Sequence, residues 1–332
     1  MNAVLLTGAG FTKTFGGYLA SEMWATILNQ PEVQDSPEIL KGMRDLENLD
    51  YEMFYEDIQA NGTEQQKKDL NAAIRSAFKE MDDNIRTCKP PLPRGHRCCQ
   101  FISRIVQDQT PTFIFTLNQD MFFEHFHDRD KITVVPGLPE HLRRFREADH
   151  DSCDFSLRLP SVEELEPRKV ELFKKGFAQI AYVKLHGSQG WLSHGGSDAM
   201  VIGTQKASRI ESEPLLKWYF SLFDQVLNRP DTRLLIVGYS FRDEHINQCI
   251  VKAIDKGLKL YIISPESPQD FKNHFKPPLH GKFEQRPFGD KLWEVLVQYW
   301  PTTLTDFYYD NMSPPGDLKH RGRALFRSLG LI

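Results

Sequence analysis

Six short apolar runs, each ending at a glycine or a polar motif, constrain the fold of this chain more than any other feature. They cover residues 3–7, 111–117, 132–135, 179–185, 233–239 and 258–263. Nearly continuous apolar runs are typical of strands that helices cover on both faces of a sheet. From residue 94 to residue 300 the runs alternate with helical patterns, which is the signature of βαβ units. The sequence therefore predicts an α/β fold with a Rossmann-like, doubly wound parallel sheet.

Helical patterns predict helices between these strands and an all-helical insertion near the N-terminus. The helices are expected at residues 18–29, 94–106, 213–227, 243–256 and 290–299. Residues 35–89 have an acidic, helical pattern without a strand, with helix-start residues at Ser36 and Thr63. Residues 146–168 are polar and contain prolines, so we expect a loop there.

These patterns predict three parts of the chain. Residues 1–34 and 90–300 form the Rossmann-like domain, residues 35–89 form the helical insertion, and residues 301–332 form a C-terminal tail. In the tail, Leu325, Phe326 and Leu329 have the spacing of a helix that docks on the core.

Composition and charge exclude several classes of protein. Of the 332 residues, 40% are hydrophobic and 26% are charged, as in globular proteins. The net charge of -4 provides no basic surface, so we expect no direct nucleic-acid partner, and we interpret the basic run at 141–146 as a solvated helix face. The sequence has no membrane-spanning stretch, and its start lacks the features of a signal peptide. We therefore expect a cytoplasmic protein.

The cysteines argue against a metal or disulfide framework. There are five, at Cys88, Cys98, Cys99, Cys153 and Cys249. They form no CxxC pair and their number is odd, which is atypical of a zinc ribbon or of a set of disulfides. We expect reduced thiols and no bound metal.

The first apolar run ends in Gly8-Ala9-Gly10. A glycine pair at the first βα turn lets the backbone approach a pyrophosphate, which the N-terminus of the next helix attracts. The residues that follow do not complete GxGxxG, so the dehydrogenase fingerprint is absent. A tight turn without a ligand is the alternative interpretation.

Polar residues also follow two of the later runs. Asn118 and Asp120 come after residues 111–117, and His186 comes after residues 179–185. Because ligands bind outside the carboxyl ends of parallel strands, we expect these motifs to converge on one crevice. His186 is expected to titrate near neutral pH and to serve as a general base. The alternatives are a helix cap for Asn118 or Asp120 and an ordinary hydrogen-bonded histidine.

A fourth motif runs from the strand at 233–239 into the helix at 243–256. It contains Gly238, Ser240 and Asn247, and its geometry suits a second phosphate or ribose contact. The alternative is a capped turn with Ser240 or Asp243 at the start of the helix.

Taken together, the motifs resemble the sirtuin superfamily over about residues 1–300. TLNQDMFFEH, VKLHGS followed by Trp191, and GYSFRDEHIN are more similar to bacterial sirtuin-like NAD hydrolases of phage defence than to protein deacylases. The four zinc cysteines of deacylase sirtuins are missing, and so is the Pro-Asp-Phe-Arg segment after the first glycine turn. These departures argue against an acyl-lysine substrate.

The resemblance implies an NAD glycohydrolase that releases nicotinamide and ADP-ribose as an effector of anti-phage defence by NAD depletion. The catalytic residues would be Asn118 and His186. NAD would be bound by Gly8, Ala9, Gly10, Phe11, Asp120, Gly187, Gly238, Ser240 and Asn247. The implied partners are further copies of the chain and a separate sensor chain, such as an ATPase/translocase or an Argonaute-type protein.

Two other functions remain as alternatives. One is an NAD-dependent protein deacylase, and the other is a non-catalytic module that binds NAD or ADP-ribose and reports it to a partner. A dehydrogenase ranks last because the first turn lacks its fingerprint.

Overall fold

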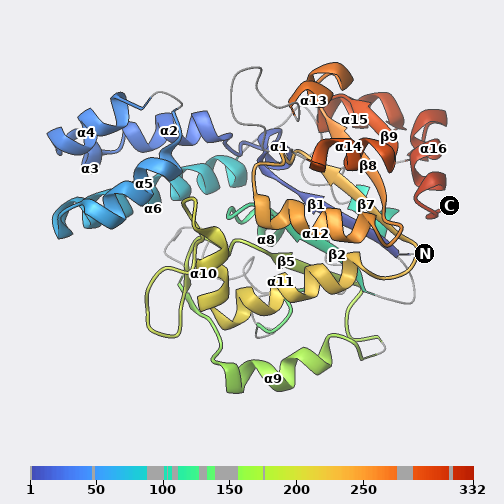
Figure 1. The fold of residues 1–332 in the computed structure, drawn as a ribbon, viewed down its shortest axis with the longest axis horizontal. Coiled ribbons are helices and arrows are strands. Elements are labelled where there is room, and N and C mark those ends of the chain that lie inside the picture. The colour runs from blue at the N-terminus through green and yellow to red at the C-terminus, as the bar shows by residue number, and fades with distance from the viewer. Residues whose placement is uncertain are drawn as a thin grey trace.

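The computed structural model describes residues 2–46, 49–87, 101–102, 104–106, 111–126, 133–138, 156–174, 176–274, 287–313 and 317–332. A parallel sheet lies at the centre of the molecule, with helices on both sides (Figure 1). Seven strands of the described chain form it, in the order β3-β5-β2-β1-β7-β8-β9. Their bounds are β1 (Asn2–Thr7), β2 (Thr112–Thr116), β3 (Thr133–Val134), β5 (Ile180–Lys184), β7 (Thr232–Val237), β8 (Lys259–Ser264) and β9 (Leu296–Pro301). The predicted α/β fold with a doubly wound parallel sheet is therefore confirmed.

Successive side chains of each strand enter two separate cores. In β1, Ala3 and Leu5 belong to one hydrophobic cluster, whereas Val4 and Leu6 belong to the other. This follows from the alternation of side chains along a strand. Helices cover both faces of the sheet at its central strands, which explains why β2, β7 and β8 are almost entirely apolar.

Helices follow most strands and cover the two faces. Their bounds are α1 (Ala9–Lys13), α8 (Phe122–Phe126), α9 (Val162–Glu171), α10 (Lys206–Ser212), α11 (Pro214–Leu227), α12 (Glu244–Ile254), α13 (Pro268–His274), α14 (Pro287–Glu294), α15 (Leu304–Asn311) and α16 (His320–Ser328). α11 and α12 bury their apolar stripes in the cluster that contains Val4 and Leu6. α11 leads into β7, and α12 connects β7 to β8.

The insertion is built of helices in the part that the structure describes. Between residues 20 and 87 lie α2 (Ala20–Leu28), α3 (Pro31–Gln34), α4 (Pro37–Arg44), α5 (Tyr51–Asn61) and α6 (Glu64–Thr87), which lie together at one side of the sheet (Figure 1). The last three fall within the predicted insertion at 35–89. Asp50 caps α5 by accepting hydrogen bonds from the N–H groups of Glu52 and Met53. Leu70, Ala73 and Ala77 belong to one buried stripe of α6. The exact domain boundaries stay a prediction.

Two sequence predictions are wrong. The helix expected at residues 290–299 ends at Glu294, and β9 then pairs with β8 at the edge of the sheet. A half-buried edge strand has a mixed pattern, which resembles that of a helix. Within the loop expected at 146–168, residues 156–168 include β4 (Leu157–Arg158) and the start of α9. Ser161 begins α9 with a capping box.

The other part of that loop, residues 146–155, lies outside the described residues, as do the basic run at 141–146 and most of the helix expected at 94–106. Four of the five cysteines also lie there, and Cys249 is a buried free thiol. No helix in the described parts of the chain is both long and apolar enough to cross a membrane.

The C-terminal tail docks on the core, as predicted. Leu325, Phe326 and Leu329 are buried in the same cluster as Leu5. A short hairpin of β10 (Met312–Ser313) and β11 (Asp317–Leu318) joins α15 to α16. A second small pair is formed by β4 and β6 (Trp191–Leu192).

Candidate functional site

The polar motifs lie at one edge of the sheet. The last residues of β5, β2, β1 and β7 are partners in register, so the segments that follow them leave the sheet side by side. Gly8, Asn118, His186 and Gly238 each lie one or two residues beyond such a strand end. The fold thus brings together residues that are far apart in the sequence.

The glycines allow the turns after β1 and β7 to pack directly on each other. A Cβ at Gly8 would lie 2.6 Å from the carbonyl oxygen of Gly238, and one at Gly10 would lie 2.8 Å from its Cα. Gly238 itself has φ +67°. The N–H groups of Gly8 and Gly10 donate to the carbonyls of Val237 and Gly238, at 3.1 and 3.0 Å. These two N–H groups are therefore used within the protein, as the tight-turn interpretation requires.

Two other predicted ligand residues have structural roles. The ring of Phe11 is fully buried and stacks on Phe123, with the centroids 5.6 Å apart. The amide of Asn247 accepts a hydrogen bond from the Tyr239 hydroxyl at 2.9 Å and donates to the carbonyl of Phe241 at 2.8 Å. Asn247 thus holds the turn that leads into α12.

Ala9 and Ser240 are exposed at the ends of neighbouring strands. Gly187 has φ +71°, and a Cβ there would lie 2.0 Å from the carbonyl oxygen of Ala199. It therefore permits the close approach of two loops.

The side chain of Asn118 is held in one orientation. Its Nδ2 donates to the carbonyl of Gly8 at 3.0 Å and to Oγ1 of Thr12 at 3.2 Å. A carbonyl can only accept, so Nδ2 and not Oδ1 must face Gly8. Among the described residues, Oδ1 has no hydrogen-bond partner. The amide oxygen is therefore positioned to accept a hydrogen bond from a hydroxyl group or a water molecule.

Gln119 links the Asn118 segment to the His186 segment. Its Nε2 donates to the carbonyl of His186 at 3.3 Å and to that of Val201 at 2.7 Å. Its own carbonyl accepts from the hydroxyl of Ser188 at 3.3 Å. Gln119 had no predicted role, yet its hydrogen bonds hold together the segments that carry the two predicted catalytic residues.

Asp120 is buried and caps α8. Its carboxylate accepts from the N–H of Phe122 and from the hydroxyl of Thr12, both at 3.0 Å. The helix-cap alternative is therefore correct for this residue. Burial raises the pKa of Asp120, and nearby Lys184 only partly opposes the effect.

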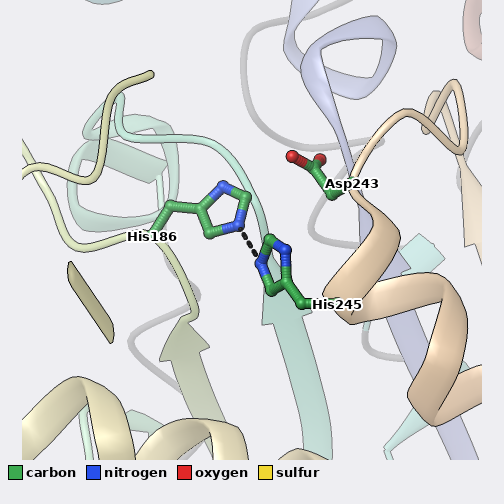
Figure 2. A group of neighbouring side chains, drawn as sticks. All are labelled: His186, Asp243 and His245. Atoms are coloured by element: carbon green, nitrogen blue, oxygen red, sulfur yellow. Dashed lines mark hydrogen bonds between the residues drawn. The ribbon is translucent and has the colours of Figure 1, made fainter. Parts of the chain in front are cut away.

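Buried His186 and half-buried His245 form a hydrogen-bonded pair (Figure 2). Their Nε2 atoms are 3.0 Å apart, so one ring donates and the other accepts. Burial lowers the pKa of His186 to about 3, although Asp243 opposes the effect. The expectation that His186 titrates near neutral pH is wrong, because removal from water penalises the imidazolium. Both rings are neutral at physiological pH, since burial also lowers the pKa of His245.

Asp243 supplies the negative charge beside the two rings. It occupies the N-cap position of α12, but its carboxylate makes no cap bond and instead pairs with Nζ of Lys206 at 2.8 Å. Burial alone would raise the pKa of Asp243, but the positive charge of Lys206 and its hydrogen bond lower it below its ordinary value. The carboxylate therefore remains ionised.

The helical insertion holds this ion pair in place through α5. Nζ of Lys206 also lies 2.9 Å from the carboxylate of Glu52. One turn further along α5, Glu56 accepts from the N–H groups of Thr204 and Gln205, at 2.9 and 3.2 Å. The insertion thus fixes the segment that carries Lys206 and, through it, Asp243.

Sequence reasoning missed His245, Lys206 and Glu52. A signal existed only for His245, which follows Asp243 by two residues in the motif after β7. Lys206 and Glu52 lie in ordinary helical segments, and only the tertiary structure shows that they meet.

Residues 112–279 match the SIR2-like domain family. This chain belongs to that family. The matched SIR2-like segment contains Asn118, His186, Asp243 and His245, whereas the first glycine turn precedes it. A solved structure reported under "Structural Basis for the Mechanism and Regulation of Sir2 Enzymes" has 14% sequence identity and a TM-score of 0.33. Its alignment covers 89% of this chain and 92% of that chain. No curated protein matches the chain.

Proposed function

We propose that this SIR2-like protein is an NAD glycohydrolase. It would cleave the bond between nicotinamide and ribose with water and produce nicotinamide, ADP-ribose and a proton. The observation that carries the proposal is the position of Asn118 and a neutral His186 at one sheet edge, inside the segment that matches the SIR2-like domain. The resemblance of the motifs to sirtuin-like NAD hydrolases supports NAD as the substrate.

The side chains fit the ribose end of NAD. Oδ1 of Asn118 would accept a hydrogen bond from a ribose hydroxyl or from the attacking water. The bonds from its Nδ2 to Gly8 and Thr12 fix the amide before the substrate arrives. Such preorganisation avoids the cost of orienting the group during the reaction.

His186 would accept the proton from the water or from a ribose hydroxyl. A neutral imidazole has the lone pair that this step requires, and His186 is neutral in the folded protein. The cation that forms would be stabilised by the ionised carboxylate of Asp243, which raises the pKa of His186 against the effect of burial. It would also keep the hydrogen bond between its Nε2 and that of His245. His245 and Asp243 would act through His186, as positioning residues.

The leaving group needs little acid assistance. The ring nitrogen of nicotinamide carries a formal positive charge in NAD, so the bond pair returns to it and nicotinamide leaves as a neutral molecule. Positive charge then spreads over the ribose. The carboxylates of Asp243 and Glu52, with one Lys206 between them, leave a net negative charge nearby that would stabilise it.

The pyrophosphate would lie across the ends of β1 and β7. Ala9 and Ser240 are exposed there, and Gly8, Gly10 and Gly238 form the packed turns that present them. Gly187 and Asp120 would shape the nicotinamide side of the site. Gly187 would do so by letting its loop pack against Ala199, and Asp120 by accepting the N–H of Phe122 at the start of α8.

Product analysis of the purified full chain with NAD tests the proposal. We expect nicotinamide and ADP-ribose in equal amounts without an added acyl peptide. Asn118→Ala and His186→Ala should each reduce turnover by about a hundredfold or more. His186→Ala removes the general base, and Asn118→Ala removes the group that holds the ribose hydroxyl or the attacking water. Exposed His194 provides the matched control, and His194→Ala should keep the parent rate.

Other outcomes separate the alternatives. Turnover only with an acyl peptide would identify a deacylase, and tight NAD binding without product would identify a binding module. Parent-like rates in both variants, with unchanged melting temperatures, would contradict the assigned roles.

The biological setting is also part of the proposal. We assign the activity to anti-phage defence by NAD depletion, in a homo-oligomer that a separate sensor chain activates, on the basis of the motif resemblance. Size-exclusion fractions assayed for NAD turnover test the oligomer, because an active monomer would contradict it.

A further inference from the structure

Three side chains with metal-binding atoms meet at the carboxyl ends of β5 and β7. His186, Asp243 and His245 each place one ligand atom within 4.8 Å of the other two. Figure 2 shows the two rings facing each other with the carboxylate of Asp243 beside them. Two imidazoles and one carboxylate are a donor set found in catalytic zinc sites and in non-haem iron sites.

The spacing of the two imidazoles suits a shared ion. Tetrahedral zinc with bonds of about 2.0–2.1 Å places two nitrogen ligands about 3.3 Å apart. The Nε2 atoms of His186 and His245 are 3.0 Å apart in the protein. An ion would replace the proton that now lies between them, and one ring would carry its proton on Nδ1 instead.

The carboxylate of Asp243 has one oxygen that could bind a metal. Lys206 bonds to Oδ1 of Asp243, which leaves Oδ2 without a hydrogen bond from any described residue. The carboxylate can therefore bind an ion while its pair with Lys206 remains.

We propose that His186, Asp243 and His245 bind one divalent transition-metal ion, Zn²⁺ in the first instance, and that this ion inhibits the enzyme. The inhibitory part rests on the proposed NAD hydrolysis, whereas the binding part does not. An ion bound to Nε2 of His186 leaves the only proton of that ring on Nδ1, so the ring has no lone pair left with which to accept a proton. The ion also places a double positive charge next to a ribose on which positive charge develops, which opposes cleavage.

Binding is tested without reference to activity. The EDTA-treated full chain is titrated with Co²⁺, and visible absorption shows whether the ion enters a site of low coordination number; calorimetry with Zn²⁺ gives the stoichiometry. We expect one ion per chain. His245→Gln and Asp243→Asn keep the size of each side chain but replace a ligand, and both should weaken binding by at least about tenfold.

His194→Ala is the matched control, because His194 is exposed and is not a member of the cluster. It should bind Co²⁺ and Zn²⁺ like the parent protein. Absence of binding, or equal binding by the parent, His245→Gln and Asp243→Asn, overturns the site. Parent-like circular dichroism and melting of the two variants show that any loss does not reflect unfolding.

Inhibition is then measured on the parent protein and on His194→Ala. One equivalent of Zn²⁺ should lower NAD turnover by about a hundredfold, comparable to the loss of a general base, and EDTA should restore it. Zinc binding without any effect on turnover, or with activation, overturns the inhibitory role. Zinc binding by a protein that does not hydrolyse NAD would instead contradict the proposed function and leave the metal site intact.

Discussion

Replacing Gly238 with alanine tests how the turns after β1 and β7 pack together. Gly238 has φ +67°, and a Cβ there would lie 2.3 Å from the backbone nitrogen of Phe11 and 2.4 Å from the carbonyl carbon of Gly10. The left-handed conformation costs an alanine about 1–2 kcal/mol. The overlap involves backbone atoms that a side-chain rotation cannot relieve, and it adds about 1–3 kcal/mol. Gly238→Ala should therefore lower the free energy of unfolding by about 2–5 kcal/mol.

Gly257 is the matched control for this substitution. It has φ +92°, and no atom lies within 4 Å of the position of a Cβ. Gly257→Ala incurs only the conformational cost, so the difference between the two variants isolates the contact between the turns. Urea unfolding followed by tryptophan fluorescence measures both. Equal unfolding midpoints and slopes for the two variants would refute the reasoning.

The same comparison has a functional consequence. Asn118 is held by the carbonyl of Gly8, which lies directly against Gly238. Displacement of this turn should therefore reduce NAD turnover in Gly238→Ala and leave it unchanged in Gly257→Ala, below the urea concentrations that unfold either variant.

Three further predictions concern ionisable groups that the fold partly or fully buries. Glu52→Gln removes one carboxylate from Lys206 and should lower the free energy of unfolding by about 1 kcal/mol. The control, Lys67→Met, breaks only an exposed pair with Glu64 and should lower it less. Equal losses in the two variants would contradict a role for α5 in the site. Burial raises the pKa of Asp82 well above its ordinary value, so the folded state binds this proton more tightly than the unfolded state does. The free energy of unfolding therefore falls as pH rises above about 4. Asp82→Asn should flatten this fall in urea titrations from pH 4 to 8, and an unchanged dependence of stability on pH would contradict the prediction. The pKa of His186 is lowered from 6.5 to about 3, so its contribution to stability is lost as pH falls from 6.5 toward 3. The loss is up to about 1.4 kcal/mol per pH unit. His186→Gln should weaken the dependence of stability on pH in this range, and a parent-like pH profile would refute the burial of a neutral His186.

Much of the sheet could be predicted because both of its faces are buried. Strands such as β7 and β8 are almost entirely apolar and end at a glycine or a serine, so their limits are visible in the sequence. The edge strand β9 was mistaken for the end of a helix. It is only half covered, and its mixed sequence lacks that signal.

The site was predictable in place but less so in chemistry. That Asn118 and His186 lie at one sheet edge follows from parallel strands that end in polar motifs. The roles of Phe11 and Asn247 did not follow, because burial in an aromatic cluster and a turn-holding amide depend on neighbours that are distant in the sequence. The same reason hid Gln119, whose amide reaches the loop after β5.

By itself, the sequence determined the alternation of strands and helices, the polar motifs at the strand ends and the tail helix that docks on the core. These are local patterns of hydrophobicity and backbone freedom, which neighbouring residues encode. Only the tertiary structure decided that His186 pairs with His245, that Glu52 of the insertion reaches Lys206, and that His186 stays neutral. The physical reason is that a pKa and an ion pair depend on burial and on charges brought close by the fold, and distance along the chain reports neither.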